Sequence, residues 1–244
     1  MSKVVTTTVL PDVAGGSVTL GGTGDSVVVT GNDLRANILQ DAGGNAVFTS
    51  NGSGVMSGMN SGLTTGALNL IQSQTASNSA SVSFTSGIDS TYDVYIFKFI
   101  DINPATDNAY FQFQVNAAGG SGFNETITST AFRSINHETS GTTSLNYETG
   151  EDQAQGTSYQ DISYSTGNDA DQCVTGCLHL FSPSSTTYVK HFYCRTSGMT
   201  HGDYAIDYYV AGYFNTTSAL TQVNFKVDSG NFDGTIKLYG ISKS

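Results

Sequence analysis

Three cysteines and two histidines lie close together in the sequence and could bind a metal ion. Cys173 and Cys177 are four residues apart, and His179, His191 and Cys194 follow within the next 17 residues. Zn²⁺ takes about four thiolate or imidazole ligands, so these residues form a candidate zinc site. An odd number of cysteines is a poor basis for a disulfide framework. Free or buried thiols on strands are therefore our main interpretation, and zinc binding is the alternative.

The turn Ser-Pro-Ser-Ser between two of these segments predicts how they pair. A hairpin centred near Ser185 would set His179 directly opposite His191. Two facing imidazoles can bind a metal, but no third ligand or positioned carboxylate lies on the same strands. This pattern favours a solvated pair of histidines.

The same pairing bears on the thiols. It places Cys177 beside Tyr193 and close to Cys194. A disulfide from Cys194 to Cys177 or to Cys173 therefore stays open, because only the geometry of the strands can decide it.

Acidic residues gather in one stretch that has no basic residue. Between Arg133 and Lys190 the acids are Glu138, Glu148, Glu151, Asp152, Asp161, Asp169 and Asp171. The segments GEDQAQG and GNDADQ could offer carboxylates and carbonyls to Ca²⁺, although neither has the spacing of an EF-hand loop. Solvated acidic loops that keep the chain soluble are the more common explanation. Paired acids also occur in glycoside hydrolases, where two carboxyl groups need a fixed separation.

Tyrosines interspersed with Asn, Ser and Asp are candidates for surface recognition. Flat aromatic rings beside short polar groups are suited to sugars or protein surfaces, and packing in the core is the alternative role. The candidates are Tyr147, Tyr159, Tyr164, Tyr204 and Tyr209. The sequence has no G-x-S-x-G or H-E-x-x-H motif and no Gly-rich phosphate loop ahead of a helix, which favours a protein that is not an enzyme.

The elements that must position these side chains are β-strands. From about residue 63 onward, apolar and polar residues alternate in 11 segments, and no convincing amphipathic helix appears. The pattern predicts an all-β fold, an antiparallel jelly-roll or β-sandwich head over residues 63–244. The segments 92–102 and 204–214 are apolar on both faces, so each is either central in its sheet or meets another subunit.

The N-terminal part has a different composition, with Phe48 its only aromatic residue before residue 84. Residues 17–62 contain short apolar bursts about ten residues apart, separated by Gly, Asn and Asp. Such short strands cannot build a core alone, so we expect identical chains to intertwine as a three-chain β-stalk. Its shared core would contain Val18, Leu20, Val27, Val29, Leu34, Ile38, Leu39, Val47 and Phe48.

Three other arrangements of this region stay open. The bursts could add edge strands to the head, or part of the segment could be flexible. Residues 32–42 could instead form a short helix capped by Asn32, with Leu34, Ile38 and Leu39 on one face. Residues 1–16 are expected to act as an anchor peptide.

Composition and charge exclude several functional classes. Only 12% of the residues are charged, and the net charge of −11 with nine basic residues argues against nucleic-acid binding. No run of about 18 apolar residues predicts a membrane span, and the N-terminus lacks the pattern of a secretory signal. A protein acting outside a cell would then leave it as part of an assembled particle.

Several segments resemble virion proteins of tailed bacteriophages, particularly marine phages. The C-terminal segment SALTQVNFKVDSGNFDGTIKLYGISKS is similar to the closing strand pair of such proteins, with GTIKLYGI its most telling part. The segments 67–115 and 167–192 look like the same family, and LQDAGGNAVFTSNGSGVMSGM is similar to stalk segments that precede such heads. The resemblance implies a virion-surface protein and no catalytic residues.

We therefore expect a trimeric, non-enzymatic fibre or spike, assembled in the host cytoplasm and attached through its N-terminus to a capsid or tail protein. Tail fibres of this family usually carry a larger anchoring domain ahead of the stalk, and here about 16 residues precede the first repeat, so a docking peptide that adds strands to its host protein is expected. The head would contact host-surface glycans, without a required cofactor. A capsid decoration protein that only stabilises the particle is the first alternative, and a glycan-degrading tailspike is the second.

Overall fold

The computed structural model describes residues 38–40, 46–50, 56–57 and 67–243. The chain divides into two compact units, Met1–Leu63 and Thr64–Ser244. Every regular element in the described ranges is a β-strand, and all the paired strands are antiparallel. The predicted all-β class is confirmed.

The first unit contains a small three-stranded sheet in the order β1-β2-β3. Its strands are β1 (Ile38–Gln40), β2 (Ala46–Ser50) and β3 (Met56–Ser57). Leu39 pairs with Phe48, and a bulge follows between Leu39 and Gln40. Because Ile38–Gln40 is a strand, the alternative of a helix running through these residues is wrong; the short apolar burst pairs with β2 instead of continuing for a helical turn.

The residues expected in the stalk core fall only partly within the described ranges. Ile38 is 51% exposed and Val47 is half-buried in the single chain, and Leu39 and Phe48 lie on paired strands. The remaining five lie outside the described residues, as does the expected anchor 1–16; they are Val18, Leu20, Val27, Val29 and Leu34. Intertwining of three chains stays a prediction.

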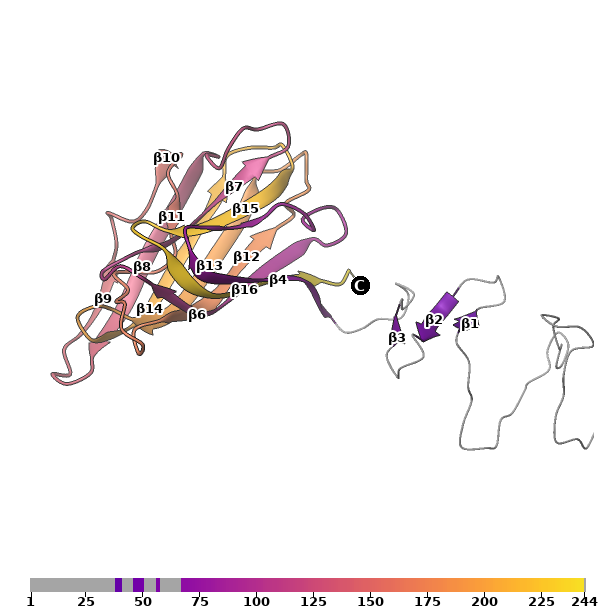
Figure 1. Cartoon of the computed structure of the whole chain (residues 1–244). Helices are drawn as coiled ribbons and strands as arrows, with labels where there is room; N and C mark the ends of the chain where they lie inside the picture. The colour runs from indigo at the N-terminus through magenta and orange to yellow at the C-terminus, as the bar shows by residue number, and fades with distance from the viewer. Residues whose placement is uncertain (1–37, 41–45, 51–55, 58–66, 244) are drawn as a thin grey trace, which may run out of the picture. The chain divides into compact units, whose positions relative to one another are not determined.

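The second unit is a sandwich of two sheets, which Figure 1 shows as two layers. The larger sheet has the order β10-β8-β14-β13-β12-β6-β16-β4, with β9 also paired to β8. Its strands are β4 (Leu68–Ser79), β6 (Val94–Pro104), β8 (Ile127–His137), β9 (Thr143–Tyr147), β10 (Ala154–Gly156), β12 (Val174–Phe181), β13 (Lys190–Met199), β14 (Tyr204–Phe214) and β16 (Phe232–Ile241).

The smaller sheet has the order β11-β7-β15-β5. Its strands are β5 (Val82–Phe84), β7 (Phe111–Ala117), β11 (Gln160–Asp161) and β15 (Leu220–Val227). Phe225 lies at its centre, with ring centroids 5.1 Å from Phe97 and 5.4 Å from Phe99 of the larger sheet. Phe111 and Phe113 stack on the same ring from the neighbouring strand. Aromatic packing between the inner faces therefore holds the sandwich together.

Alternation predicted the long strands because each has one face in this core. β9 and β10 were not predicted: both pair with β8 at the edge of the large sheet, and the side chains of β9 are exposed or only partly buried. Of the two options for segments that are apolar on both faces, the central position is the observed one. β6 lies between β12 and β16, and β14 lies between β13 and β8.

Candidate functional site: an aromatic groove on the large sheet

The outer face of the large sheet, which points away from the small sheet, carries an unusual number of aromatic side chains. On β13 the buried residues Phe192, Cys194 and Thr196 alternate with exposed His191, Tyr193 and Arg195. Residues directly opposite each other on paired strands share a face, so the ladder registers place further rings in the same rows. Such a face is where a ligand could contact several rings at once.

One row across the sheet begins with three stacked groups. Phe132 of β8 pairs with Tyr209 of β14, and their rings are parallel with centroids 4.8 Å apart. The guanidinium of Arg195 lies 4.9 Å from the Tyr209 ring, and two hydrogen bonds of 2.8 and 2.9 Å join it to Asp207. Tyr147 of β9 is paired with Phe132 and is 55% exposed. The row is flat, partly apolar and held in place by neighbouring side chains.

The next row contains a second stack. His179 of β12 pairs with Tyr193, and the two rings are nearly parallel at 4.5 Å. Phe181 lies 5.7 Å from the same tyrosine ring. Burial, and to a smaller extent Lys98, lowers the pKa of His179, which keeps this imidazole neutral at neutral pH. A neutral imidazole stacks without adding charge to the face.

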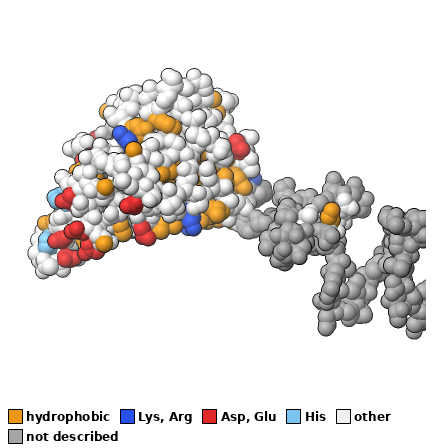
Figure 2. Space-filling model, in the orientation of Figure 1, with side chains coloured by type: hydrophobic (Ala, Val, Ile, Leu, Met, Phe, Trp, Pro, Cys, Tyr) orange, Lys and Arg blue, Asp and Glu red, His pale blue; other side chains and the backbone are white. Residues whose placement is uncertain are grey.

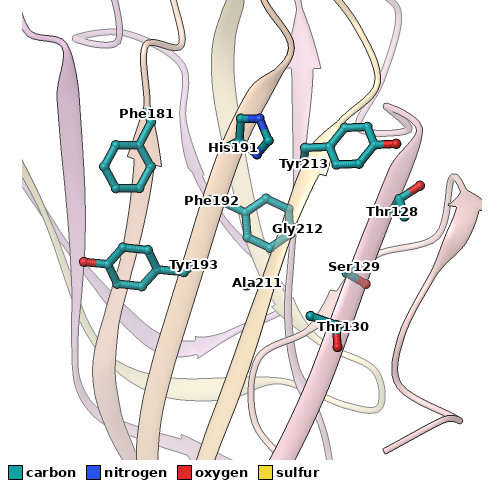
Figure 3. Close-up of a pocket in the computed structure, with 10 residues that line it drawn as sticks. All are labelled: Thr128, Ser129, Thr130, Phe181, His191, Phe192, Tyr193, Ala211, Gly212 and Tyr213. Atoms are coloured by element: carbon teal, nitrogen blue, oxygen red, sulfur yellow. The ribbon is translucent and has the colours of Figure 1, made fainter.

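Beside Tyr193 and Phe181 the face is hollowed into what we call the aromatic groove, with a volume of about 430 Å³. Ala211 pairs with Tyr193 on one side and with Thr130 on the other, so a methyl group separates a ring from a hydroxyl. Figure 3 shows Phe181 and Tyr193 on one side and Thr128 and Thr130 on the other. The small side chain at position 211 creates the hollow.

Gly212 forms part of the floor of the groove, and no larger residue fits at this position. A Cβ atom at this position would lie 2.5 Å from the carbonyl oxygen of Thr128 and 2.9 Å from the ring of Phe192. The ring of Phe192 occupies the inner side of the sheet beneath it, packed against Phe113 and Phe214. The floor is thus supported by the core and has little freedom to move.

The far wall of the groove is polar. His191 pairs with Tyr213, which pairs in turn with Thr128 of β8. Gln155 of β10 donates a hydrogen bond to Thr128 and lies within 3.5 Å of the Tyr213 hydroxyl. A flat ring bordered by hydroxyl, amide and imidazole groups suits a pyranose, whose C–H face packs on aromatic rings while its hydroxyls exchange hydrogen bonds.

The structure separates the five predicted recognition tyrosines. It brings Tyr147 and Tyr209 together in the first row of the outer face. Tyr164 and Tyr204 line another cavity, and Tyr159 directly precedes β11 of the small sheet, where its hydroxyl donates to Asn224. Sequence reasoning missed the outer-face residues Phe132, His179, Phe181, Tyr193, Arg195 and Tyr213. Their alternation with buried residues on four long strands was the available signal.

The acidic stretch forms a different kind of cluster. A side-chain hydrogen bond joins Glu151 to Asp161, and Gln112 donates to Asp161 at 2.6 Å. Burial, followed by Glu151, raises the pKa of Asp161 to about 8. Direct contact between the two carboxyl groups leaves no room for a sugar between them, unlike the separation of about 5 Å or more in glycosidases. Among the described residues no three Asp, Glu, His or Cys side chains group as metal ligands.

The predicted pairing of His179 with His191 is wrong. The connection 182–189 between β12 and β13 includes Ser182 in a left-handed conformation, and it moves the register so that His179 faces Tyr193 and Cys177 faces Arg195. The predicted neighbourhood of Cys177 and Tyr193 is wrong for the same reason.

The three thiols are free, so neither possible disulfide forms. Cys194 pairs with Leu178, the neighbour of Cys177 on β12, and lies on the buried face. Consecutive strand residues point to opposite faces, which keeps the Cys177 thiol away from that of Cys194.

Comparison with models of known protein families, with curated proteins and with solved structures gives no match. Within the described ranges no helix is long and apolar enough to cross a membrane.

Proposed function

We propose that the protein is a non-enzymatic structural protein of a tailed-bacteriophage virion, and that its β-sandwich head binds a glycan of the host surface in the aromatic groove. In this proposal it is a homotrimer that projects as a fibre or spike from the virion surface and attaches to the capsid or tail through its N-terminus. The resemblance of the sequence to such virion proteins supports the source and the location. The aromatic groove carries the assignment of recognition.

The groove supports a saccharide because rings and hydrogen-bonding groups occur in one hollow. Phe181 and Tyr193 offer apolar faces, and Thr130, His191 and Tyr213 offer hydrogen-bonding groups. Its volume of about 430 Å³ is that of a small-ligand site and holds one or two sugar rings. Figure 2 shows one face of the second unit, on which charged side chains are sparse except at one end, where acidic groups gather. The described residues that line the groove include no Asp, Glu, Lys or Arg, so a neutral or weakly charged glycan fits it.

Binding of the full-length protein to polysaccharide purified from host cells tests the proposal. Ala211→Tyr should fill the hollow and Tyr193→Ala should remove a ring, and each should weaken binding by about two- to tenfold, since an aromatic contact contributes about 0.5–1.5 kcal/mol. Tyr188→Ala is the matched control, because Tyr188 is 73% exposed and lies outside the groove. Equal binding by all four proteins, or by none, would refute the proposed recognition site.

Two further measurements separate this proposal from the alternatives. Light scattering should give a mass three times that of the 25.6 kDa chain, and a monomer at micromolar concentration would contradict the trimer. Particles lacking the protein should adsorb poorly to cells. Normal adsorption with a lower thermal stability of the capsid would instead identify a decoration protein.

A further inference from the structure

A second cavity, separate from the aromatic groove, contains a cation with unused hydrogen-bond donors. It has a volume of about 370 Å³ and lies beside the ends of β8 and β14; we call it the Arg133 cavity. Arg133, Tyr164, Ser165, Thr200, His201 and Tyr204 contribute to its lining. Two isolated bridges, from Thr166 to Ala109 and to Thr200, connect its loops to the rest of the sandwich.

Arg133 is held in place on two sides. Its guanidinium lies 3.5 Å from the centroid of the Tyr164 ring, and its Nε atom is 2.8 Å from Oε1 of Glu148. Burial raises the pKa of Glu148, and the contact with Arg133 opposes that shift. The ion pair and the stacking fix the plane of the guanidinium, so little side-chain entropy remains to be lost when a ligand binds.

The terminal nitrogens of Arg133 are available to a ligand. No hydrogen bond to another described residue uses them, and neither is fully buried, whereas Nε is buried and close to Glu148 without a hydrogen bond of good geometry. The side chain keeps 16% exposure and lines the cavity, so a ligand there can reach the terminal nitrogens. Two parallel N–H donors of this kind match the two oxygens of a carboxylate.

A polar chain on the opposite loops supplies an acceptor. Ser165 has a φ of +51° and its Oγ donates to Oδ1 of Asn108 at 2.6 Å, while Nδ1 of His201 is 2.8 Å from the same Oγ. The single hydroxyl proton goes to Asn108, so Nδ1 of His201 must be the donor to Ser165. In the tautomer with the proton on Nδ1, the Nε2 atom of His201 is an acceptor for a ligand hydroxyl.

Backbone strain also concentrates at this cavity. Asn108, Ser165 and Asp203 all have φ between 51° and 60°, and each belongs to a loop that borders the cavity or bonds to its lining. Non-glycine residues in this region cost energy and persist where the surrounding structure holds them for a purpose, often at ligand sites.

We infer that the Arg133 cavity binds a sugar residue that carries a carboxylate, such as a uronic acid. The carboxylate meets the terminal edge of Arg133, a hydroxyl donates to His201, and the sugar ring lies beside Tyr204. A sulfate or phosphate group would fit less well, because Arg133 is the only Lys or Arg among the described residues that line the cavity, and tetrahedral anions favour several cations. This site goes beyond the proposed groove and does not depend on it.

Ligand-observed NMR with the full-length protein tests the inference, with glucuronic acid and glucose as probes that differ in the carboxylate. Glucuronate should bind at least about tenfold more tightly than glucose, and Arg133→Gln should remove that preference, because a charge-assisted bidentate contact contributes about 1.5–3 kcal/mol. Arg195→Gln is the matched control, since Arg195 also lies over a tyrosine ring and pairs with a carboxylate. Its effect should stay below about twofold.

A second variant guards against misfolding of Arg133→Gln, which leaves Glu148 without its partner. Ile135→Trp fills the cavity from β8 and leaves the ion pair in place, and it should remove the preference for glucuronate over glucose. Equal affinities of the wild type for the two sugars, no glucuronate binding up to about 20 mM, or an unchanged preference in Ile135→Trp would each overturn the inference. Tyr193→Ala should leave this preference unchanged even where it weakens the binding of both sugars, so failure at the groove and failure at this cavity can be told apart.

Discussion

Replacing Asp161 by Asn should stabilise the protein at neutral pH and leave its stability unchanged in acid. Asp161 lies on the edge strand β11, accepts a hydrogen bond from Gln112, and contacts Glu151. Burial is the largest cause that raises its pKa from 3.8 to about 8. The carboxyl group therefore keeps its proton in the folded protein at pH values where the unfolded chain has released it.

The sign of the effect follows from that difference. Between about pH 4 and pH 8 the folded state holds more protons than the unfolded state, so the free energy of unfolding falls as the pH rises. Each pH unit costs about 1.4 kcal/mol, which gives an upper limit of about 4 kcal/mol between pH 4 and pH 7. Electrostatic effects at buried sites are weaker in practice than this limit, so we expect about 2 kcal/mol. The amide introduced by Asp161→Asn can keep the contacts with Gln112 and Glu151, and it has no carboxyl proton to release as the pH rises.

Urea unfolding of the wild type and of Asp161→Asn from pH 4 to pH 8 measures this difference directly. The variant should be more stable by about 2 kcal/mol at pH 7, and the two proteins should agree within about 0.5 kcal/mol at pH 4. Asp169→Asn, in an exposed loop of the same stretch, should have little effect at any pH. A variant that is less stable than the wild type by the same amount at every pH would refute the reasoning.

Three further predictions concern the core and the thiols. Phe225→Ala should cost about 3–5 kcal/mol in the free energy of unfolding, because the ring packs on both sheets; a loss below about 1 kcal/mol in urea unfolding would contradict this role. Gly212→Ala should destabilise by about 1–3 kcal/mol, whereas Gly150→Ala, with open space around its Cβ, serves as the control and should not. Thiol titration in denaturant without reductant should find three thiols per chain, and the native protein should protect one of them from modification; recovery of only one thiol would show a disulfide. The residues are Cys173, Cys177 and buried Cys194.

The fold was largely predictable because alternation records burial directly. On β15, Val223, Phe225 and Val227 face the core and alternate with residues of the other face, as the sequence pattern indicates. Strands that lack this contrast escaped prediction. β9 lies at an edge with Leu145 74% exposed, and β10 has only three residues. Their places are set by pairing with β8, which a local pattern does not contain.

The site was less predictable because it depends on register. The groove brings together residues from β8, β12, β13 and β14. A shift of one residue in the centre of a hairpin changes which residues of its two strands lie opposite each other. The sequence placed that centre near Ser185, which set two histidines opposite each other. Ser182, with a φ of +44°, begins a connection that moves it to residue 186. Neighbouring residues in the sequence could mark tyrosines as candidates for recognition. They could not show on which face, or in which of the two cavities, each tyrosine lies.

The outer face of the large sheet must be explained either by a polar ligand or by permanent contact with another chain. Its rings are interleaved with charges: Arg195 and Asp207 form an exposed pair beside Tyr209, and Lys98 lies 5.7 Å from the ring of Tyr239. The cores of permanent interfaces are depleted in charged residues, since desolvating them costs free energy. A reversible ligand with hydroxyl groups can leave these charges hydrated at the rim of the groove. The charges on the outer face therefore favour a glycan over a permanent protein contact there. In our proposal the trimer contacts then belong to the N-terminal unit.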